Sequence, residues 1–216
     1  MGDGAFFWPK RLGTNQFGPA KHFMIRYELE VLIMTTKSQV TTEDLYHVPD
    51  NGKAEIVKGQ LVVVAPTGFL PNRASFNITA SLREYEHRTK SGFAFADNAG
   101  FKVNLPHRQS FSPDAAFYTG KSTGMKFLEG APVFAVEIRS ENDYGLQAEQ
   151  TMAEKRADYF AGGTLVIWDV DLLGDDVVKV YRATDPNNPA ICHRGEVGEA
   201  EPALPGWSMP IDDLFL

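Results

Sequence analysis

The segment from Pro132 to Arg139, PVFAVEIR, constrains the fold of this chain more than any other part of its sequence. Nearly all of its residues are apolar, so a strand formed here is apolar on both faces instead of alternating between apolar and polar. Strands of that kind lie in the middle of a sheet that is covered on both sides. The segment therefore predicts a central strand with a layer of helix on each face.

Helical periodicity supplies two such layers. Apolar residues recur three or four positions apart between residues 72 and 89, and a second helix is expected over residues 147–161, ended by Gly162 and Gly163. Extended segments are expected at residues 54–64 (as a hairpin), 93–105, 114–118, 132–139, 164–170 and 177–182, with the proline-containing C-terminal segment mostly coil. This order predicts an α/β fold with a mixed β-sheet flanked by α-helices.

A chain of 216 residues is long enough for one domain of ordinary size. Residues 1–33 are interrupted by glycine and proline and are expected to form a poorly structured N-terminal extension, with the folded domain spanning residues 34–216. No apolar run approaches the roughly 18 residues of a membrane helix, so no membrane association is expected. The single cysteine, Cys192, cannot form an internal disulfide, and no signal peptide begins the chain. We therefore expect a cytoplasmic protein.

The formal net charge of −7 at pH 7 is unevenly distributed. Residues 1–128 contain 15 Lys and Arg against 11 Asp and Glu, whereas residues 129–216 contain 6 against 17. An acidic excess argues against coating nucleic acid by charge alone, although it does not exclude a local binding cleft. The range Arg73–Arg108 holds six Lys and Arg against three Asp and Glu. This range predicts a locally basic rim beside an acidic cleft, on a protein whose remaining surface is acidic.

Glu137 is the sixth residue of the apolar strand. A carboxylate taken out of water into a core must form an ion pair, bind a metal or become protonated, since an unpaired buried charge is costly. The simplest alternative to a functional role is an ion pair with Arg139, which is two residues further along and would share its strand face.

Three other residues could join Glu137. Asp114 stands at the start of a short apolar strand, although an Asp after proline is more often a turn residue. Lys155 interrupts the apolar stripe of the second helix, although its stem could lie along the surface with the ammonium in water. Glu55 falls in the first strand region, where an exposed position is the simpler interpretation. Carboxylates with few histidines suit Mg²⁺ or Mn²⁺, and these metals suit phosphate chemistry.

Several motifs in order resemble those of the Uma-type restriction endonucleases in the PD-(D/E)xK nuclease superfamily. They are TTEDLYHVPDNGKAEIVKGQLV with Glu55, SPDAAF with Asp114, PVFAVEIRSENDY with Glu137, KRADYFAGG with Lys155, and LVIWDVD. The resemblance implies a restriction-endonuclease-like core in which Asp114 and Glu137 bind Mg²⁺ or Mn²⁺ and Glu55 supports the site. The superfamily lysine usually lies two residues after the strand acid, where this chain has Arg139. The Uma-type pattern implies that Lys155 takes over its role.

The resulting prediction is a metal-dependent endonuclease that hydrolyses phosphodiester bonds in DNA, with catalytic residues Asp114, Glu137, Lys155 and Glu55. The resemblance also makes a homodimer possible, since many nucleases of the superfamily act on two strands as dimers. One alternative is a catalytically inactive module that keeps the nuclease fold and binds protein or nucleic acid. Another is a metal-dependent phosphohydrolase acting on small substrates. Motifs typical of serine hydrolases, zinc proteases and P-loop proteins are missing from the sequence.

Overall fold

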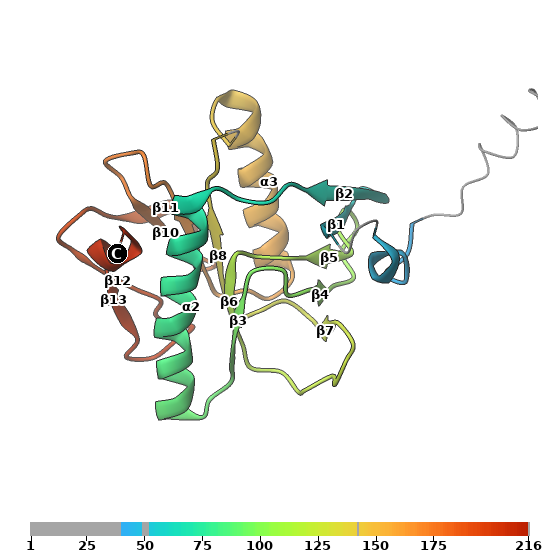
Figure 1. The fold of residues 1–216 in the computed structure, drawn as a ribbon, viewed down its shortest axis with the longest axis horizontal. Coiled ribbons are helices and arrows are strands. Elements are labelled where there is room, and N and C mark those ends of the chain that lie inside the picture. Colours follow the sequence, from blue (N-terminus) through green and yellow to red (C-terminus); the bar gives the residue numbers. More distant parts are fainter. Residues whose placement is uncertain (1–39, 49–51, 142, 216) are drawn as a thin grey trace, which may run out of the picture. The chain divides into compact units, whose positions relative to one another are not determined.

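A six-stranded mixed β-sheet organises the molecule (Figure 1). The computed structural model describes residues 40–48, 52–141 and 143–215. Across the sheet the strand order is β11-β10-β9-β8-β6-β3. Strands β8 and β9 are parallel, and every other neighbouring pair is antiparallel. The bounds are β3 (Phe93–Ala96), β6 (Ala115–Tyr118), β8 (Phe134–Ile138), β9 (Val166–Val170), β10 (Val178–Arg182) and β11 (Asp185–Cys192). The predicted mixed sheet is thus confirmed, with β8 in its interior.

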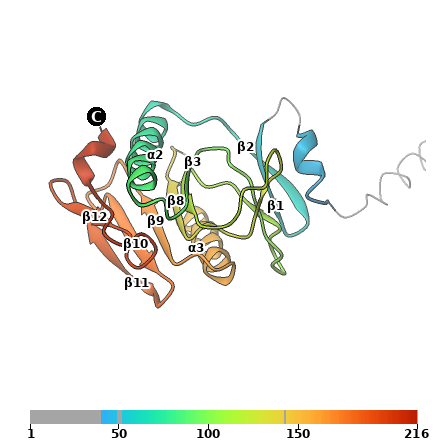
Figure 2. The same ribbon diagram turned by 90° about the horizontal axis from the view of Figure 1, so that it is seen from below.

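Two long helices cover opposite faces of this sheet, as Figures 1 and 2 show. Helix α2 (Phe69–Thr89) begins three residues before its predicted start, and α3 (Leu146–Ala161) makes the crossover between the parallel strands β8 and β9. Along β8, Phe134, Val136 and Ile138 share a core with α2. Ala135 lies in a second core with Tyr159 of α3. Because side chains alternate along a strand, Glu137 faces α3.

Smaller elements surround the main sheet. The predicted hairpin is present as β1 (Lys53–Val57) and β2 (Gln60–Val64). Backbone hydrogen bonds join β1 to the segment before Asp114, from Lys58 N–H to the His107 carbonyl and from Gln109 N–H to the Ile56 carbonyl. The other elements are η1 (Asp44–His47), β4 (Phe101–Lys102), β5 (Ser110–Phe111), β7 (Leu128–Glu129), β12 (Val197–Glu199), β13 (Ser208–Pro210) and η3 (Ile211–Phe215). Hairpin β1–β2 is thereby attached beside β5, which precedes Asp114 and β6 in the chain.

The C-terminal part of the chain is more ordered than the sequence predicts. Strand β11 pairs with β10 even though it contains Pro186 and Pro189. Proline is tolerated there because β11 is the edge strand of the sheet, where one row of N–H groups needs no partner. Further along, Leu204, Trp207 and Ile211 are buried in the core under α2. The expectation of mostly coil was therefore wrong for this segment.

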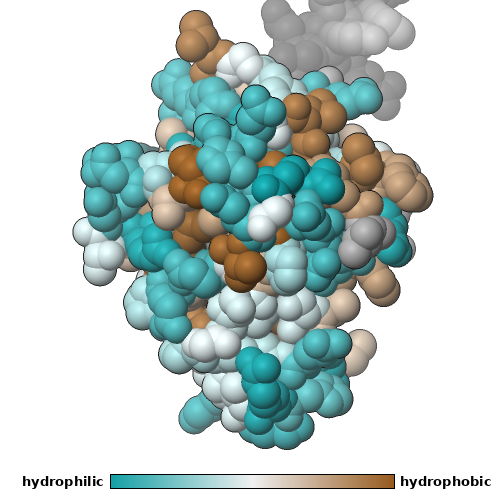
Figure 3. Space-filling model, turned by 90° about the vertical axis from the view of Figure 1, so that its left-hand side faces the viewer, coloured by the Kyte–Doolittle hydropathy of each residue, from teal (hydrophilic) through white to brown (hydrophobic). Residues whose placement is uncertain are grey.

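Polar side chains cover much of the face seen in Figure 3, and its hydrophobic side chains occur in small separate groups. In the described parts of the chain, no helix is both long enough and apolar enough to cross a membrane. The predicted N-terminal extension, residues 1–33, lies outside the described residues.

Candidate active site

The register between β6 and β8 brings Asp114 and Glu137 together. Ala115 pairs with Val136 and Ala116 with Ala135, so the same register places Asp114 opposite Glu137. The backbone supports this arrangement, because Asp114 N–H donates to the Val136 carbonyl at 3.0 Å. Asp114 Oδ2 also accepts a hydrogen bond from Ile138 N–H at 2.7 Å. Two acids that are 23 positions apart in the sequence therefore share one end of two neighbouring strands.

Glu137 is only 7% exposed and is held by two side chains of α3. Lys155 Nζ lies 2.7 Å from Glu137 Oε2, and Tyr159 Oη donates to Glu137 Oε1 at 2.6 Å. Lys155 and Tyr159 are one helical turn apart, so both project from the same face of α3. The ring of Tyr159 stacks on Phe111 with a centroid distance of 4.0 Å, which fixes the direction of its hydroxyl.

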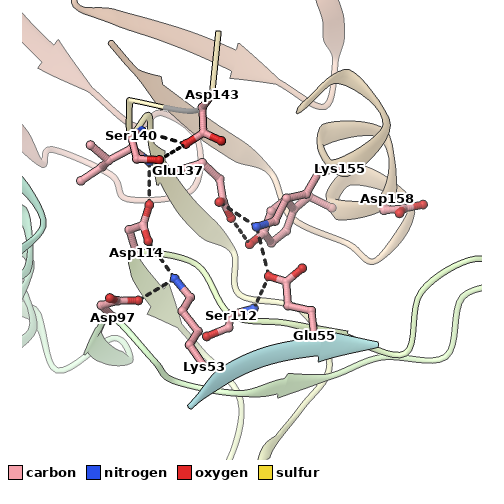
Figure 4. A network of polar contacts seen from close by, with 12 residues as sticks. Lys53, Glu55, Asp97, Ser112, Asp114, Glu137, Ser140, Asp143, Lys155 and Asp158 are labelled. Atoms are coloured by element: carbon pink, nitrogen blue, oxygen red, sulfur yellow. Dashed lines mark hydrogen bonds and ion pairs between the residues drawn. The ribbon is translucent and has the colours of Figure 1, made fainter. Parts of the chain in front are cut away.

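Glu55 reaches the same cluster from β1 (Figure 4). Its Oε1 lies 3.0 Å from Lys155 Nζ and accepts a hydrogen bond from Ser112 N–H at 2.9 Å. Its Oε2 accepts from Arg108 at 2.6 Å. Because Glu55 is 5% exposed, the interpretation as an exposed strand residue does not hold. The Lys155 ammonium thus lies between two buried carboxylates.

Lys53 is two residues before Glu55 on β1, so it faces the same way. Its ammonium lies 2.8 Å from Asp114 Oδ1 and 2.6 Å from Asp97 Oδ1. The sequence-based interpretation did not include Lys53 or Asp97 in the site. The alternation of Lys53 with Glu55 could have indicated Lys53, whereas the place of Asp97 depends on how β3 is followed by its turn.

Arg139 does not pair with Glu137. The ion pair with Arg139, which was the simplest alternative to a functional role for Glu137, is therefore excluded. Its guanidinium bonds both carboxylate oxygens of Asp169, at 2.9 and 3.0 Å, and also contacts Glu149. Asp169 is 1% exposed and is shared with Arg156 at 3.0 Å. Arg139 follows the last residue of β8, and it forms a separate ionic cluster there.

Arg108 does not belong to the predicted basic rim, so this part of the prediction was wrong. It is 4% exposed, and its guanidinium bonds Glu55 Oε2 at 2.6 Å and Asp158 Oδ2 at 2.8 Å. A side chain buried in this way belongs to the interior of the site and cannot form part of a surface rim. Its role in the structure is to hold Glu55 from the side opposite to Lys155.

The pKa values of the cluster follow from burial and from these contacts. Burial raises the pKa of Glu137 to about 7; Asp114 and Glu55 also raise it, and Lys155 opposes the change. Burial alone would lower the pKa of Lys155, but the charges of Glu137 and Glu55 outweigh it, so the pKa lies well above the usual value. Glu55 has a lowered pKa because Lys155 and Arg108 outweigh its own burial. Lys155 is therefore an ammonium at neutral pH.

The strand order, the crossover helix and a lysine–carboxylate cluster at the end of two central strands define a restriction-endonuclease-like fold. One similar solved structure, from Anabaena variabilis ATCC 29413, is described as a "putative nuclease belonging to DUF820". The match has a TM-score of 0.64 and covers 82% of this chain and 97% of that chain, at 15% sequence identity. It supports the fold.

The sequence itself matches a family model. The Uma2 family, described as "Putative restriction endonuclease", matches residues 42–212. Since the match covers well over half of the chain, the protein belongs to the Uma2 family. No curated protein matches it.

Proposed function

We propose that this protein is a divalent-metal-dependent endonuclease that hydrolyses phosphodiester bonds in DNA. The observation that carries the proposal is the single cluster formed by the facing acids Asp114 and Glu137 and the Lys155 ammonium, which lies 2.7 Å from Glu137. The description of the Uma2 family supports the endonuclease part of this proposal.

The donor set of the cluster fits Mg²⁺ or Mn²⁺. Asp114 and Glu137 offer hard carboxylate oxygens from adjacent strands, which are the ligands that these ions prefer. Within the described ranges, no group of three or more His, Cys, Asp and Glu is arranged to hold a metal ion. The proposed site would use only the two carboxylates of Asp114 and Glu137, and Mg²⁺ commonly takes one or two carboxylates and completes its shell with water and substrate phosphate. A bound ion would polarise the scissile phosphate and favour deprotonation of the attacking water.

Lys155 serves in this proposal as a hydrogen-bond donor and a fixed positive charge. Its raised pKa keeps it protonated, so it is unsuited to act as a general base. An ammonium has three donors, and the carboxylates of Glu137 and Glu55 account for two of them. We assign the third donor to the attacking water or to a phosphate oxygen, where negative charge develops in the transition state.

Tyr159, Glu55 and Arg108 hold these groups in place. The Tyr159 hydroxyl keeps Glu137 Oε1 hydrogen-bonded, independently of the partner that Glu137 Oε2 has. Glu55 forms a second ion pair with the Lys155 ammonium, which is therefore shared between Glu55 and Glu137. Arg108 in turn balances the charge of Glu55. Preorganised charges of this kind act more strongly in a buried site than in water.

Cleavage of plasmid and single-stranded DNA with Mg²⁺ or Mn²⁺ tests the proposal. We expect the wild type to cut, and Asp114→Asn, Glu137→Gln and Lys155→Met to lose at least about a hundredfold in rate, a typical loss for removal of one preorganised catalytic group. Lys121→Met is a matched control, since Lys121 is exposed and lies outside the basic range Arg73–Arg108. Wild-type activity shared by all three site variants would contradict the assignment.

A wild type that binds DNA but never cuts it would favour the inactive module. One site cuts one strand at a time, and cutting both strands of a duplex in one binding event calls for two sites, so we also propose that two copies of the chain act together. Sedimentation of the protein with and without a DNA duplex measures this. A complex that contains only one protein chain and still makes double-strand breaks would contradict the dimer.

A further inference from the structure

Lys53 places a second ammonium group, besides that of Lys155, at one end of the site. It is the first residue of β1, and its side chain is only 13% exposed. The ammonium bridges two carboxylates, Asp114 at 2.8 Å and Asp97 at 2.6 Å (Figure 4). Asp97 is the more exposed partner, with 32% of its side chain accessible. The same cation therefore touches one buried acid of the site and one acid at its margin.

The contact with Asp114 is made to a particular oxygen. Asp114 Oδ2 is held by Ile138 N–H, which leaves Oδ1 to Lys53. The ammonium also lies close enough to Glu137 for the charge of that carboxylate to act on it. Lys53 thus sits in the field of both acids proposed to bind the metal. A divalent ion arriving at Asp114 would meet a positive charge already in contact with that residue, and like charges at short range repel strongly in a buried site.

We propose that Lys53 is a positioning residue that sets the metal affinity of the site: it neutralises Asp114 when no metal is bound, and metal binding moves its ammonium onto Asp97. The inference rests on the proposed metal-dependent function. Asp97 makes the exchange possible because its oxygen is already within hydrogen-bond distance of the ammonium. Lys53 can then release Asp114 without finding a new partner, and its side chain needs to move only a little.

This role makes two predictions of opposite sign. Removing the cation with Lys53→Met should tighten Mn²⁺ binding by about tenfold, because repulsion and competition at Asp114 both disappear. Removing its second partner with Asp97→Asn should weaken Mn²⁺ binding severalfold, because Lys53 is then held by Asp114 alone. Lys53→Arg keeps the charge and should stay within about threefold of the wild type. A lysine that only supports the fold predicts weaker or unchanged metal binding in Lys53→Met.

The test is calorimetric titration of Mn²⁺ into the folded wild type, the three variants and the control Lys121→Met, with thermal unfolding of each metal-free protein measured alongside. The double variant Lys53→Met/Asp97→Asn shows whether Asp97→Asn weakens Mn²⁺ binding by removing the second partner of Lys53 or only by removing a negative charge near the metal. If Asp97 acts through Lys53, the Asp97→Asn effect shrinks to less than half in that background.

The outcomes distinguish this inference from the proposed function. Wild-type binding that is tightened by Lys53→Met supports both, and binding that appears only in Lys53→Met supports the inference even more directly. Wild-type binding with equal or weaker binding in Lys53→Met overturns the inference and leaves the proposed function standing. If Lys53→Met fails to fold, Asp97→Asn and Lys53→Arg decide, and tighter binding in Asp97→Asn would overturn the inference. No Mn²⁺ binding by any of these proteins overturns both proposals.

Discussion

The Lys155 ammonium lies 2.7 Å from Glu137 Oε2, so a helix residue neutralises a buried acid of the strand on which that helix packs. The contact joins α3 to the β8 strand that precedes it in the chain. Both partners are largely buried, with side-chain exposures of 16% and 9%. A buried pair of this kind is costly to break from one side, because the remaining charge is left without compensation.

Lys155→Met should therefore destabilise the protein as well as inactivate it. We expect the free energy of unfolding to fall by about 3–5 kcal/mol, since Glu137 and Glu55 would then face each other without the ammonium between them. Urea denaturation followed by circular dichroism measures the change. Lys121→Met, at an exposed position, should unfold at nearly the wild-type urea concentration. Equal stability of the two variants would mean that the buried pair contributes little.

Tyr159→Phe removes one hydrogen bond to Glu137 and keeps the ring that stacks on Phe111. The expected loss of unfolding free energy is about 1–3 kcal/mol, because a buried carboxylate oxygen loses its donor. Tyr144→Phe is the matched control, since the Tyr144 hydroxyl bonds Asp171 at an exposed position. Comparable losses in the two variants would show that the burial of the Tyr159 bond is unimportant.

The stability of the metal-free protein should depend on pH through Glu137. Its pKa rises from 4.5 to about 7 on folding, so the folded state favours the protonated acid. The stabilisation is fully present below about pH 4.5 and is lost as the pH rises through 7. The unfolding free energy of the wild type should therefore fall relative to that of Glu137→Gln across this window, by at most about 1.4 kcal/mol per pH unit. Parallel pH profiles of the two proteins would contradict the raised pKa.

Arg139→Met should separate stability from activity. Its guanidinium bonds Asp169 and Glu149 and not Glu137, so its loss should lower the unfolding free energy by about 3 kcal/mol while Arg156 still pairs with Asp169. DNA cleavage by the folded fraction should remain within a few fold of the wild type. A rate as low as that of Lys155→Met would instead place Arg139 in the catalytic machinery.

Much of the architecture could be predicted from the sequence because local patterns control it. The doubly apolar segment around Val136 became an interior strand, and both helices formed within a few residues of their expected bounds. The C-terminal segment could not be predicted in this way. Its prolines weaken any local preference for a strand, and β11 forms because β10 offers it an edge to pair with.

The candidate residues Asp114, Glu137, Lys155 and Glu55 could be chosen from the sequence because each places a charge where an apolar pattern predicts burial, or matches a family motif. The other residues that complete the site with them could not be predicted in that way. Asp97 carries no signal that separates it from an ordinary surface charge, and Lys53 carries only its alternation with Glu55, since exposed lysines and aspartates are common. Only the docking of β1 beside β5, shortly before Asp114 in the chain, brings Lys53 to Asp114.

By itself, the sequence determined the central strand and the two long helices and indicated a buried position for Glu137, because periodicity and the cost of burying a charge are properties of short segments. Only the tertiary structure decided which cation serves which acid. Arg139, two residues from Glu137, pairs with Asp169, whereas Lys155, 18 residues away, pairs with Glu137. The physical reason is that an ion pair depends on the distance between atoms, which the register of strands and the packing of helices set.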